Sequence, residues 1–159
     1  MAANRRLAAT DVSTLADVAA LARVSSATAS RAFNQPQLLS PKTRDRVQAA
    51  AAALRYVPDG LARSLRSNRS KVIGAVMPAL RHAYFASTVE GLQLAIARQG
   101  YTLLLATSEF DPRTELSAIE SMIRQGVDGV VLVGTQHDPE LLPLLRARGK
   151  PFVITWSYD

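Results

Sequence analysis

The sequence predicts a two-part fold, an all-α unit followed by part of an open parallel α/β sheet. Three observations predict it. Residues 15–55 have the spacing of short helices broken at turns, whereas residues 72–155 alternate continuous apolar runs with helical stretches. The charge changes at the same place: residues 1–71 hold 12 Lys and Arg against 4 Asp and Glu, a net charge of +8, and residues 72–159 hold 7 against 9, a net charge of −2.

The composition excludes several classes of protein. None of the 159 residues is cysteine, which excludes disulfide scaffolds and thiolate sites and suits the cytosol. No stretch resembles a signal peptide, and no run approaches the ~18 apolar residues of a membrane span. We therefore expect a soluble, cytoplasmic protein with no membrane partner. A basic first part is the footprint of a nucleic-acid-binding module, although by itself it also fits a solvated face or a tail.

Residues 15–33 predict two short helices with a turn at Arg23 and Val24. This is the pattern of a helix-turn-helix, whose second helix enters the DNA major groove, but it also fits an ordinary αα-hairpin. Many such turns carry glycine where this chain has Arg23. The second helix offers one small or polar face, which is formed by Ser26, Ala27, Thr28, Ser30 and Arg31.

Caps and spacing define these helices. Asp11 or Thr14 is expected to cap the first, and Ser25 the second, because a side-chain oxygen there accepts from a free N–H of the first turn. Helical spacing in the first helix predicts a buried stripe of small residues that lets a crossing helix come close. That stripe comprises Ala16, Ala19 and Ala22, flanked by Val18 and Leu21, with Val24 at the corner and Leu38 and Leu39 tucked under the unit.

A third helix is expected from Pro41 to about Arg55, with Ser40 as its cap. Its apolar positions, Val47, Ala50, Ala51 and Leu54, follow the helical period. Asp59 can cap a short fourth helix at residues 60–67, which has Leu61 and Leu65 on one face beside Arg63 and Arg66. It fits a linker helix that lays two leucines on its own domain. It also fits a hinge that orders on DNA, pairs with its twin through Leu61 and wedges Leu65 into the minor groove.

A series of short motifs runs in unbroken order from Thr14 to Gly74. They are D-V-A at residues 17–19, V-S at 24–25, T-x-S-R at 28–31, Asn34, L-S-x-x-T-R at 39–44, Y-x-P at 56–58 and A-R-S-L at 62–65. This combination resembles the headpiece and hinge of the LacI/GalR (lactose-repressor type) transcription regulators. The resemblance implies a sequence-specific regulator, expected to be a repressor, that binds pseudo-palindromic double-stranded operator DNA as a homodimer.

The resemblance also implies roles for single residues. Ser26 and Ala27 occupy the positions that vary with operator sequence, and Arg31 is the base-reading arginine. Leu65 matches the intercalating leucine, and Arg66 stands where a basic residue can follow the minor groove. The candidate phosphate-positioning residues are Thr14, Ser25, Thr28, Ser30, Asn34 and Thr43. With small side chains at 26 and 27, we expect Arg31 and the kinked central step to carry much of the specificity.

Residues 72–159 predict a βα series. Apolar runs at 72–77, 101–106, 129–134 and 152–155 are expected to be buried parallel strands, with helices at 84–99, 112–125 and 139–148 between them. Ligands bind such sheets at the carboxyl ends of the strands. Those ends mix aromatic and hydrogen-bonding residues, which suits a sugar or another small polar metabolite.

The resemblance supports this expectation, because the core of the family is similar to periplasmic sugar-binding proteins. It implies an effector, such as a sugar or sugar acid, that shifts DNA affinity through the hinge. Tyr84, Phe85 and Trp156 fall where the family often has effector contacts, although aromatic residues at strand–helix junctions also serve as packing. We expect neither a cofactor nor a metal nor a catalytic residue.

The expected domains are a DNA-binding headpiece at 13–58, a hinge and linker at 59–70, and an incomplete effector domain at 71–159. The last strand is expected to have an unpaired side and the chain to be a fragment that binds effector weakly or not at all. Two rivals remain, a nonspecific architectural DNA binder and an α/β enzyme. The enzyme has little support, because no glycine-rich loop follows a strand, and loop polarity explains Ser108, Asp111 and Asp138.

Overall fold

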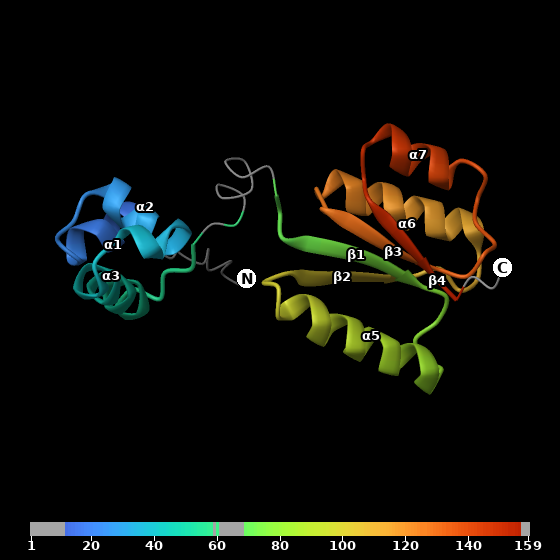
Figure 1. Ribbon diagram of the computed structural model, residues 1–159, viewed down its shortest axis with the longest axis horizontal. Coiled ribbons are helices and arrows are strands. Elements are labelled where there is room, and N and C mark those ends of the chain that lie inside the picture. The colour runs from blue at the N-terminus through green and yellow to red at the C-terminus, as the bar shows by residue number, and fades with distance from the viewer. Residues whose placement is uncertain (1–11, 59, 61–68, 157–159) are drawn as a thin grey trace, which may run out of the picture. The chain divides into compact units, whose positions relative to one another are not determined.

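Three α-helices and a 3₁₀ turn form the first part of the computed structural model, which describes residues 12–58, 60 and 69–156 (Figure 1). They are α1 (Leu15–Leu21), α2 (Ser26–Asn34), η1 (Pro36–Leu38) and α3 (Pro41–Ala53). The chain divides into two compact units, residues 1–60 and 61–159, and each is described by itself. The predicted hinge residues Leu61, Leu65 and Arg66 lie outside the described residues.

Side-chain caps begin all three α-helices, as expected. The Thr14 side chain accepts from the Asp17 N–H, and the Asp17 carboxylate accepts from the Thr14 N–H at 2.7 Å, which makes a capping box. Ser25 accepts from the Thr28 N–H at 3.1 Å, and Ser40 plays the same part for α3. Of the two caps that the sequence allowed for the first helix, Thr14 is the one in place.

The buried line of α1 differs from the expected stripe. Ala16 and Leu21 are exposed, whereas Val18, Ala19 and Ala22 are buried. With Leu15 packed beside them, these residues follow the spacing i, i+3, i+4, i+7 of a single helical face, and Ala16 lies outside that face. The prediction from the alanines alone therefore assigned the wrong face of α1 to the core. The larger side chains of Leu15 and Val18 define the face that is buried.

The expectation for the leucine pair is half right. Leu39 packs against the helical core, but Leu38, within η1, is largely exposed. Phe33 and Tyr56 complete the edge of this core, with ring centroids 5.8 Å apart.

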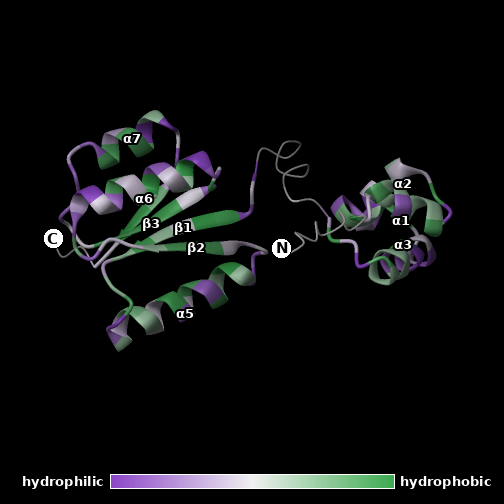
Figure 2. Ribbon diagram, turned by 180° about the vertical axis from the view of Figure 1, so that it is seen from behind, coloured by the Kyte–Doolittle hydropathy of each residue, from purple (hydrophilic) through white to green (hydrophobic). Residues whose placement is uncertain are grey.

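The second unit is a four-stranded, fully parallel sheet. Its strands are β1 (Val72–Met77), β2 (Thr102–Thr107), β3 (Gly129–Val133) and β4 (Phe152–Thr155), in the order β2-β1-β3-β4. Their apolar residues give the central strands the hydrophobic colour of Figure 2. As the sequence predicted, β4 is at the edge of the sheet and pairs, among the described residues, only with β3.

Helices cover both faces of this sheet (Figure 1). Helix α5 (Ala83–Ala97) lies on one face, and α6 (Pro112–Arg124) and α7 (Leu141–Ala147) lie on the other. The chain leaves β1 toward β2 on one side and reaches β3 on the other, so the winding reverses between β1 and β3. In open α/β sheets this switch point opens a crevice at the carboxyl ends of the strands. The predicted fold class is confirmed.

Asp128 fixes the opposite end of the sheet, where the chain enters β1. Its carboxylate accepts from the Ser70 N–H (2.8 Å), the Ser70 hydroxyl (3.1 Å) and the Lys71 N–H (3.0 Å). Burial alone would raise the pKa of this carboxyl, but the three hydrogen bonds and the charge of Lys150 outweigh it and lower the pKa below its ordinary value. The start of β1 is thereby tied to the start of β3.

Candidate functional site

Helix α2 turns a small, polar face outward. Ala29 and Ala32 bury the inner face of the helix, which leaves Ser26, Ala27 and Arg31 exposed on the outside. The inner alanines let α1 and α3 pack closely behind α2, because a methyl group adds little thickness between helices. The result is a rigidly backed helix whose outer face carries one long side chain and two short ones.

The other polar candidates of this unit form pairs at helix ends. The Ser25 and Thr28 hydroxyls lie 2.9 Å apart at the start of α2, and the Ser40 and Thr43 hydroxyls lie 2.9 Å apart at the start of α3. The Asn34 amide donates to the Ser30 carbonyl at 2.9 Å. Helix N-termini carry unpaired N–H groups and a partial positive charge, so hydroxyl-lined N-termini are suited to phosphate.

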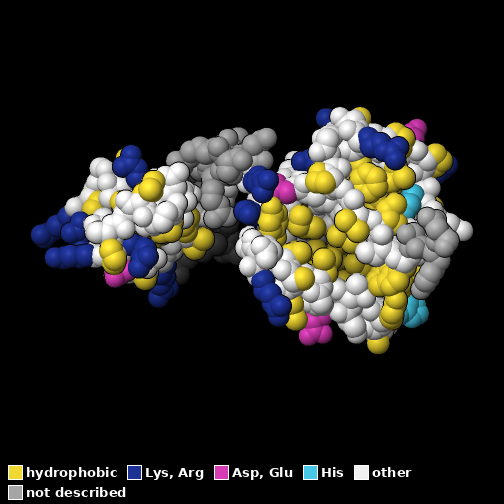
Figure 3. All heavy atoms as spheres, in the orientation of Figure 1, with side chains coloured by type: hydrophobic (Ala, Val, Ile, Leu, Met, Phe, Trp, Pro, Cys, Tyr) yellow, Lys and Arg dark blue, Asp and Glu magenta, His cyan; other side chains and the backbone are white. Residues whose placement is uncertain are grey.

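Positive side chains surround these helix ends. Figure 3 shows Lys and Arg gathered over the helical unit. Asp17 and Asp45 are the acidic residues among those of the unit that the structure describes. The exposed basic residues of this unit are Arg23, Arg31, Lys42, Arg46 and Arg55. The surface therefore has the charge that a polyanion requires.

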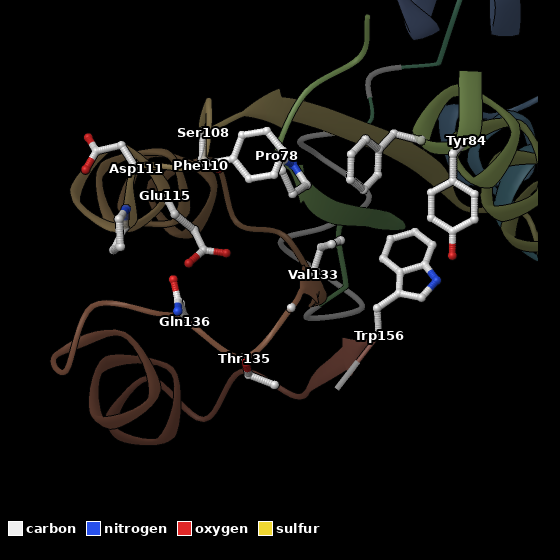
Figure 4. A pocket seen from close by; sticks show the side chains of 13 residues that line it. Pro78, Tyr84, Ser108, Phe110, Asp111, Glu115, Val133, Thr135, Gln136 and Trp156 are labelled. Carbon is white, nitrogen blue, oxygen red and sulfur yellow. The ribbon is translucent and has the colours of Figure 1, made fainter. Parts of the chain in front are cut away.

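A pocket of about 470 Å³ opens at the switch point of the sheet (Figure 4). Residues that follow the carboxyl ends of all four strands line it, together with the first turns of α5 and α6. The three aromatic residues predicted from the sequence, Tyr84, Phe85 and Trp156, are brought together here. The Trp156 ring centroid lies 5.0 Å from that of Tyr84 and 5.6 Å from that of Phe85.

Three of the six non-glycine residues with positive φ, among those described, lie at or next to this pocket. Phe110 (φ 63°) and Trp156 (φ 57°), which both line it, adopt the left-handed conformation that L side chains rarely adopt. Glu109, next to Phe110 and paired with Arg81, has φ 50°. Such conformations cost roughly 1–3 kcal/mol each and cluster at ligand sites, where they aim side chains inward.

Polar groups occupy the other side of the pocket. The sequence interpretation of Ser108 as a polar residue of a surface loop is wrong. Ser108 is only 6% exposed and lines the pocket. Asp111 also lines the pocket, but its carboxylate caps α6. A hydrogen bond from the Thr114 hydroxyl, and others from the Arg113 and Thr114 N–H groups, lower the pKa of Asp111 below its ordinary value.

Glu115 and His137 form a buried pair beside the pocket. Both side chains are 7% exposed, and the His137 Nδ1 atom lies 2.8 Å from the Glu115 Oε2 atom. The other ring nitrogen, Nε2, lies 3.1 Å from the Gly134 carbonyl oxygen. Glu115 is in the first turn of α6 and lines the pocket, while His137 follows β3.

Sequence reasoning missed this pair and Phe110. Phe110 was within the predicted strand-end loop and could have been found there as a fourth aromatic residue. Glu115 and His137 are 22 residues apart and carry no spacing signal. Among the described residues, no group of three or more His, Asp and Glu side chains is placed to hold a metal ion. None of the helices that the structure describes has the length and apolarity needed to cross a bilayer.

Both units match known protein families. Residues 14–59 match the family described as bacterial regulatory proteins, lacI family, and residues 70–157 match periplasmic binding proteins and the sugar binding domain of the LacI family. The catabolite control protein A of Staphylococcus xylosus is 32% identical over 142 residues, which are 89% of this chain and 43% of that protein. The transcriptional repressor PurR of Klebsiella pneumoniae is 33% identical over 144 residues, 90% of this chain and 42% of that protein.

A solved structure agrees with this result. The lac repressor dimer bound to operator and the anti-inducer ONPF has a TM-score of 0.77 and 27% identity to this chain, and the match covers 92% of this chain and 45% of the repressor chain. The present chain thus spans less than half the length of these relatives. The helix-turn-helix unit, the parallel sheet and both family matches have one common explanation: the chain belongs to the LacI family of bacterial regulatory proteins.

Proposed function

We propose that this chain is the DNA-binding part of a sequence-specific transcription regulator that acts as a repressor on a pseudo-palindromic operator. The observation that carries the proposal is the outer face of α2, where Ser26, Ala27 and Arg31 are exposed on a helix backed by buried alanines. A helix of this kind fits the major groove, where base edges present distinct hydrogen-bonding patterns. The relatives named above are a catabolite control protein and repressors, which supports a regulatory rather than an enzymatic role.

Within this proposal, Arg31 reads bases and the capped helix ends hold the phosphate backbone. Arginine makes two parallel hydrogen bonds to guanine, a contact worth ~1–3 kcal/mol of discrimination. Ser26 and Ala27 are too short to reach far across the groove, so we expect them to select bases by steric complementarity with the base edges. The proposed phosphate contacts are Thr14, Ser25, Thr28, Ser30, Asn34 and Thr43. Leu65 and Arg66 are proposed to act in the minor groove. Leu61 is proposed to contact the hinge of the second copy in the homodimer.

The pocket at the strand ends supports control by a small molecule. We infer that the whole protein binds a small polar effector such as a sugar or sugar acid, with Tyr84, Phe85 and Trp156 contacting it. The lac repressor structure named above is a dimer with operator and an anti-inducer bound, and a homodimer suits a two-fold-related pair of half-sites. This role calls for a cytoplasmic protein.

The first test is selection from a randomised pool of pseudo-palindromic DNA at near-physiological salt. We expect one symmetric site with a pyrimidine–purine step at its centre, bound ~10³-fold or more tightly than scrambled DNA. Binding that depends on salt but not on sequence would favour the architectural alternative instead. A symmetric site identifies a specific dimeric regulator.

Substitution of Arg31 tests the base-reading role. Arg31→Ala should lose ~1–3 kcal/mol for the selected site, about 10- to 100-fold, with a much smaller loss for scrambled DNA. Arg31→Lys keeps the charge and should recover the nonspecific binding but only part of the specific binding. Arg46→Ala, on the exposed side of α3, is the charge-matched control and should weaken both DNAs equally. Equal losses for Arg31→Ala on both DNAs would contradict the proposed role.

A further inference from the structure

The sheet unit separates its charged side chains between the two edges at which its strands start and end. The strands are parallel and each connecting helix runs back, so α5, α6 and α7 end at the edge where the strands start. We call this the strand-start edge. Besides Arg124, which pairs with Glu120, six basic residues of the described chain lie there: Arg69, Lys71, Arg98, Arg146, Arg148 and Lys150.

The opposite edge, where the strands end, carries the opposite charge. Among the described residues it holds Arg81 and Arg113 against five acidic residues, Glu109, Asp111, Glu115, Asp138 and Glu140. Figure 3 shows Lys and Arg side chains gathered where β1 begins. A surface that serves only solubility mixes both signs, whereas this separation directs a positive potential outward from one edge.

The fold itself accounts for only part of this positive charge. Each helix C-terminus carries about half a negative charge, so the three helix ends offset roughly 1.5 of the six positive charges, and Asp128 offsets about one more. A surplus of roughly three to four positive charges therefore remains by this estimate. Arg98, Arg146 and Arg148 are exposed, and no carboxylate of the described residues pairs with them.

Three of these side chains are clustered, and one of them is held in place. Arg69, Arg148 and Lys150 line one hollow at the strand-start edge. The Lys150 ammonium donates to the Val127 carbonyl at 2.7 Å, and a carbonyl acceptor positions an ammonium without neutralising it. A side chain that is already positioned loses less conformational entropy when a partner binds. The edge is therefore suited to an extended anion that can contact several cations at once.

Chain connectivity favours duplex DNA as that anion. Positions 58 and 69 of the sequence are eleven residues apart, and a fully extended chain spans at most about 3.6 Å per residue, so about 40 Å separates them at most. A duplex bound by the helical unit is thus present at a high effective concentration near the strand-start edge. Cations that contact its phosphates release counterions, which favours binding to any sequence.

We propose that the strand-start edge of the sheet unit is a second DNA-binding surface, which contacts phosphates of the duplex and reads no bases. The inference rests on the proposed function, because the helical unit brings the duplex within reach. The exposed residues Arg98, Arg146 and Arg148 contribute to the affinity for DNA and to its dependence on salt. Selectivity between sequences stays with the outer face of α2.

The test removes two of these charges from the full chain. The double variant Arg98→Gln/Arg148→Gln is titrated against the selected operator and a scrambled duplex of the same length, over salt concentrations of about 50–200 mM. We expect the slope of log K against log salt concentration to become shallower by about 1–2, and the affinity near 100 mM salt to fall by about 5- to 50-fold. Both DNAs should lose affinity equally, so that the specificity ratio is unchanged.

A charge-matched variant separates position from net charge. Arg81→Gln/Arg113→Gln removes the same two charges from exposed positions at the opposite edge. Strands of five or six residues put the two edges roughly 17–20 Å apart, beyond the screening length of about 10 Å near 100 mM salt. This variant should lose less than about twofold in affinity. Equal losses in the two double variants, or no loss in either, overturn the inference.

Replacement by lysine distinguishes a lost charge from a disturbed fold. Arg98→Lys/Arg148→Lys keeps both charges and should bind DNA within about twofold of the unaltered chain, because a phosphate contact needs a cation rather than a guanidinium plane. A lysine variant that binds as weakly as the glutamine variant overturns the inference. Poly-glutamate serves as a second polyanion: a loss seen with poly-glutamate and not with DNA also overturns it, and would indicate an acidic protein as the partner.

The unaltered chain distinguishes the two levels of failure. If it binds the operator selectively and the two double variants do not differ, only the second DNA-binding surface is overturned. If it binds all DNA alike, while Arg98→Gln/Arg148→Gln still loses affinity and Arg81→Gln/Arg113→Gln does not, the sequence-specific function is overturned and the second surface stands.

Discussion

The two units of the chain bury different kinds of side chain. Among the described residues, the core of the helical unit consists of six alanines, Val18 and Val47. The core of the sheet unit consists of branched and long side chains, such as Ile119, Leu132, Leu141 and Leu145. The helices of the first unit thus pack against one another mainly through alanine methyl groups. In the second unit, larger side chains pack between the sheet and its helices.

This difference matches where each unit keeps its candidate functional groups. Small buried residues allow three short helices to pack closely, so the polar face of α2 stays outside, where a large partner such as DNA can reach it. The sheet unit instead has its hollow at the strand ends, beside the first turn of α6. Ser108 and Glu115 line this hollow, which suits a ligand small enough to be surrounded.

Removal of a large side chain from the sheet unit should have the greatest effect on stability. Leu141, in α7, is fully buried, and Leu141→Ala should lower the free energy of unfolding of this unit by about 2–5 kcal/mol, since a cavity replaces the lost contacts. Urea unfolding followed by Trp156 fluorescence measures it. Leu94→Ala, exposed on α5, is the control and should change it by less than about 0.5 kcal/mol. A loss below about 1 kcal/mol for Leu141→Ala would contradict the packing described.

The helical unit should respond to the opposite change. Ala29, fully buried in α2, leaves no room for a larger group, and Ala29→Leu should destabilise this unit by about 1–3 kcal/mol or more. Far-UV circular dichroism and loss of DNA binding report it, while the Trp156 transition should stay unchanged. Ala52→Leu, at an exposed site of α3, should be tolerated. A matching shift of the Trp156 transition would show that the units do not fold separately.

Asp128 should give the sheet unit a specific dependence on pH. Because the folded-state pKa of this carboxyl is lowered, the stability that it contributes is complete above its ordinary pKa and is lost as the pH falls through its folded-state value. Asp128→Asn should cost about 1–3 kcal/mol at neutral pH, and the difference from the unaltered chain should shrink between about pH 5 and pH 2. Thermal unfolding at a series of pH values measures it.

Ser70→Ala provides a graded comparison for Asp128. It removes one of the three donors to the carboxylate and should produce a smaller loss than Asp128→Asn, with the same direction of pH dependence. The difference in the free energy of unfolding between Asp128→Asn and the unaltered chain could instead stay constant down to about pH 2. That result would show that ionisation of the Asp128 carboxyl does not contribute to stability.

The smallest expected effect is a gain in stability. Arg23 adopts φ 51° in the turn between α1 and α2, a conformation that glycine adopts without strain. Arg23→Gly should stabilise the helical unit by about 0.5–1 kcal/mol. This net gain is the backbone strain that is relieved minus the cost of the greater conformational entropy that glycine gives the unfolded chain. Arg46→Gly, within α3, should instead destabilise by about 1 kcal/mol. If both variants destabilise equally, Arg23 is not strained.

The prediction from sequence was most accurate where local chemistry determines the structure. Ser25 and Ser40 cap their helices as expected, because a hydroxyl can satisfy an N–H only two or three residues away. The four apolar runs form parallel strands as expected, but only β1 and β3 bury most of their residues, and Val153 in the edge strand β4 is 60% exposed. Ala16 was placed in the core wrongly, since residue type alone does not fix the rotation of a short helix about its axis.

The sequence by itself determined the two-part architecture, the helix ends, the strands and the face of α2 that carries Arg31, because periodicity and capping act over a few residues. The tertiary structure decided which distant side chains meet. Only the packing of α6 against the sheet brings Glu115 to His137, and only the switch point of the sheet brings Trp156 to Tyr84. Contacts across 22 or more residues depend on the topology of the whole unit, which no local pattern records.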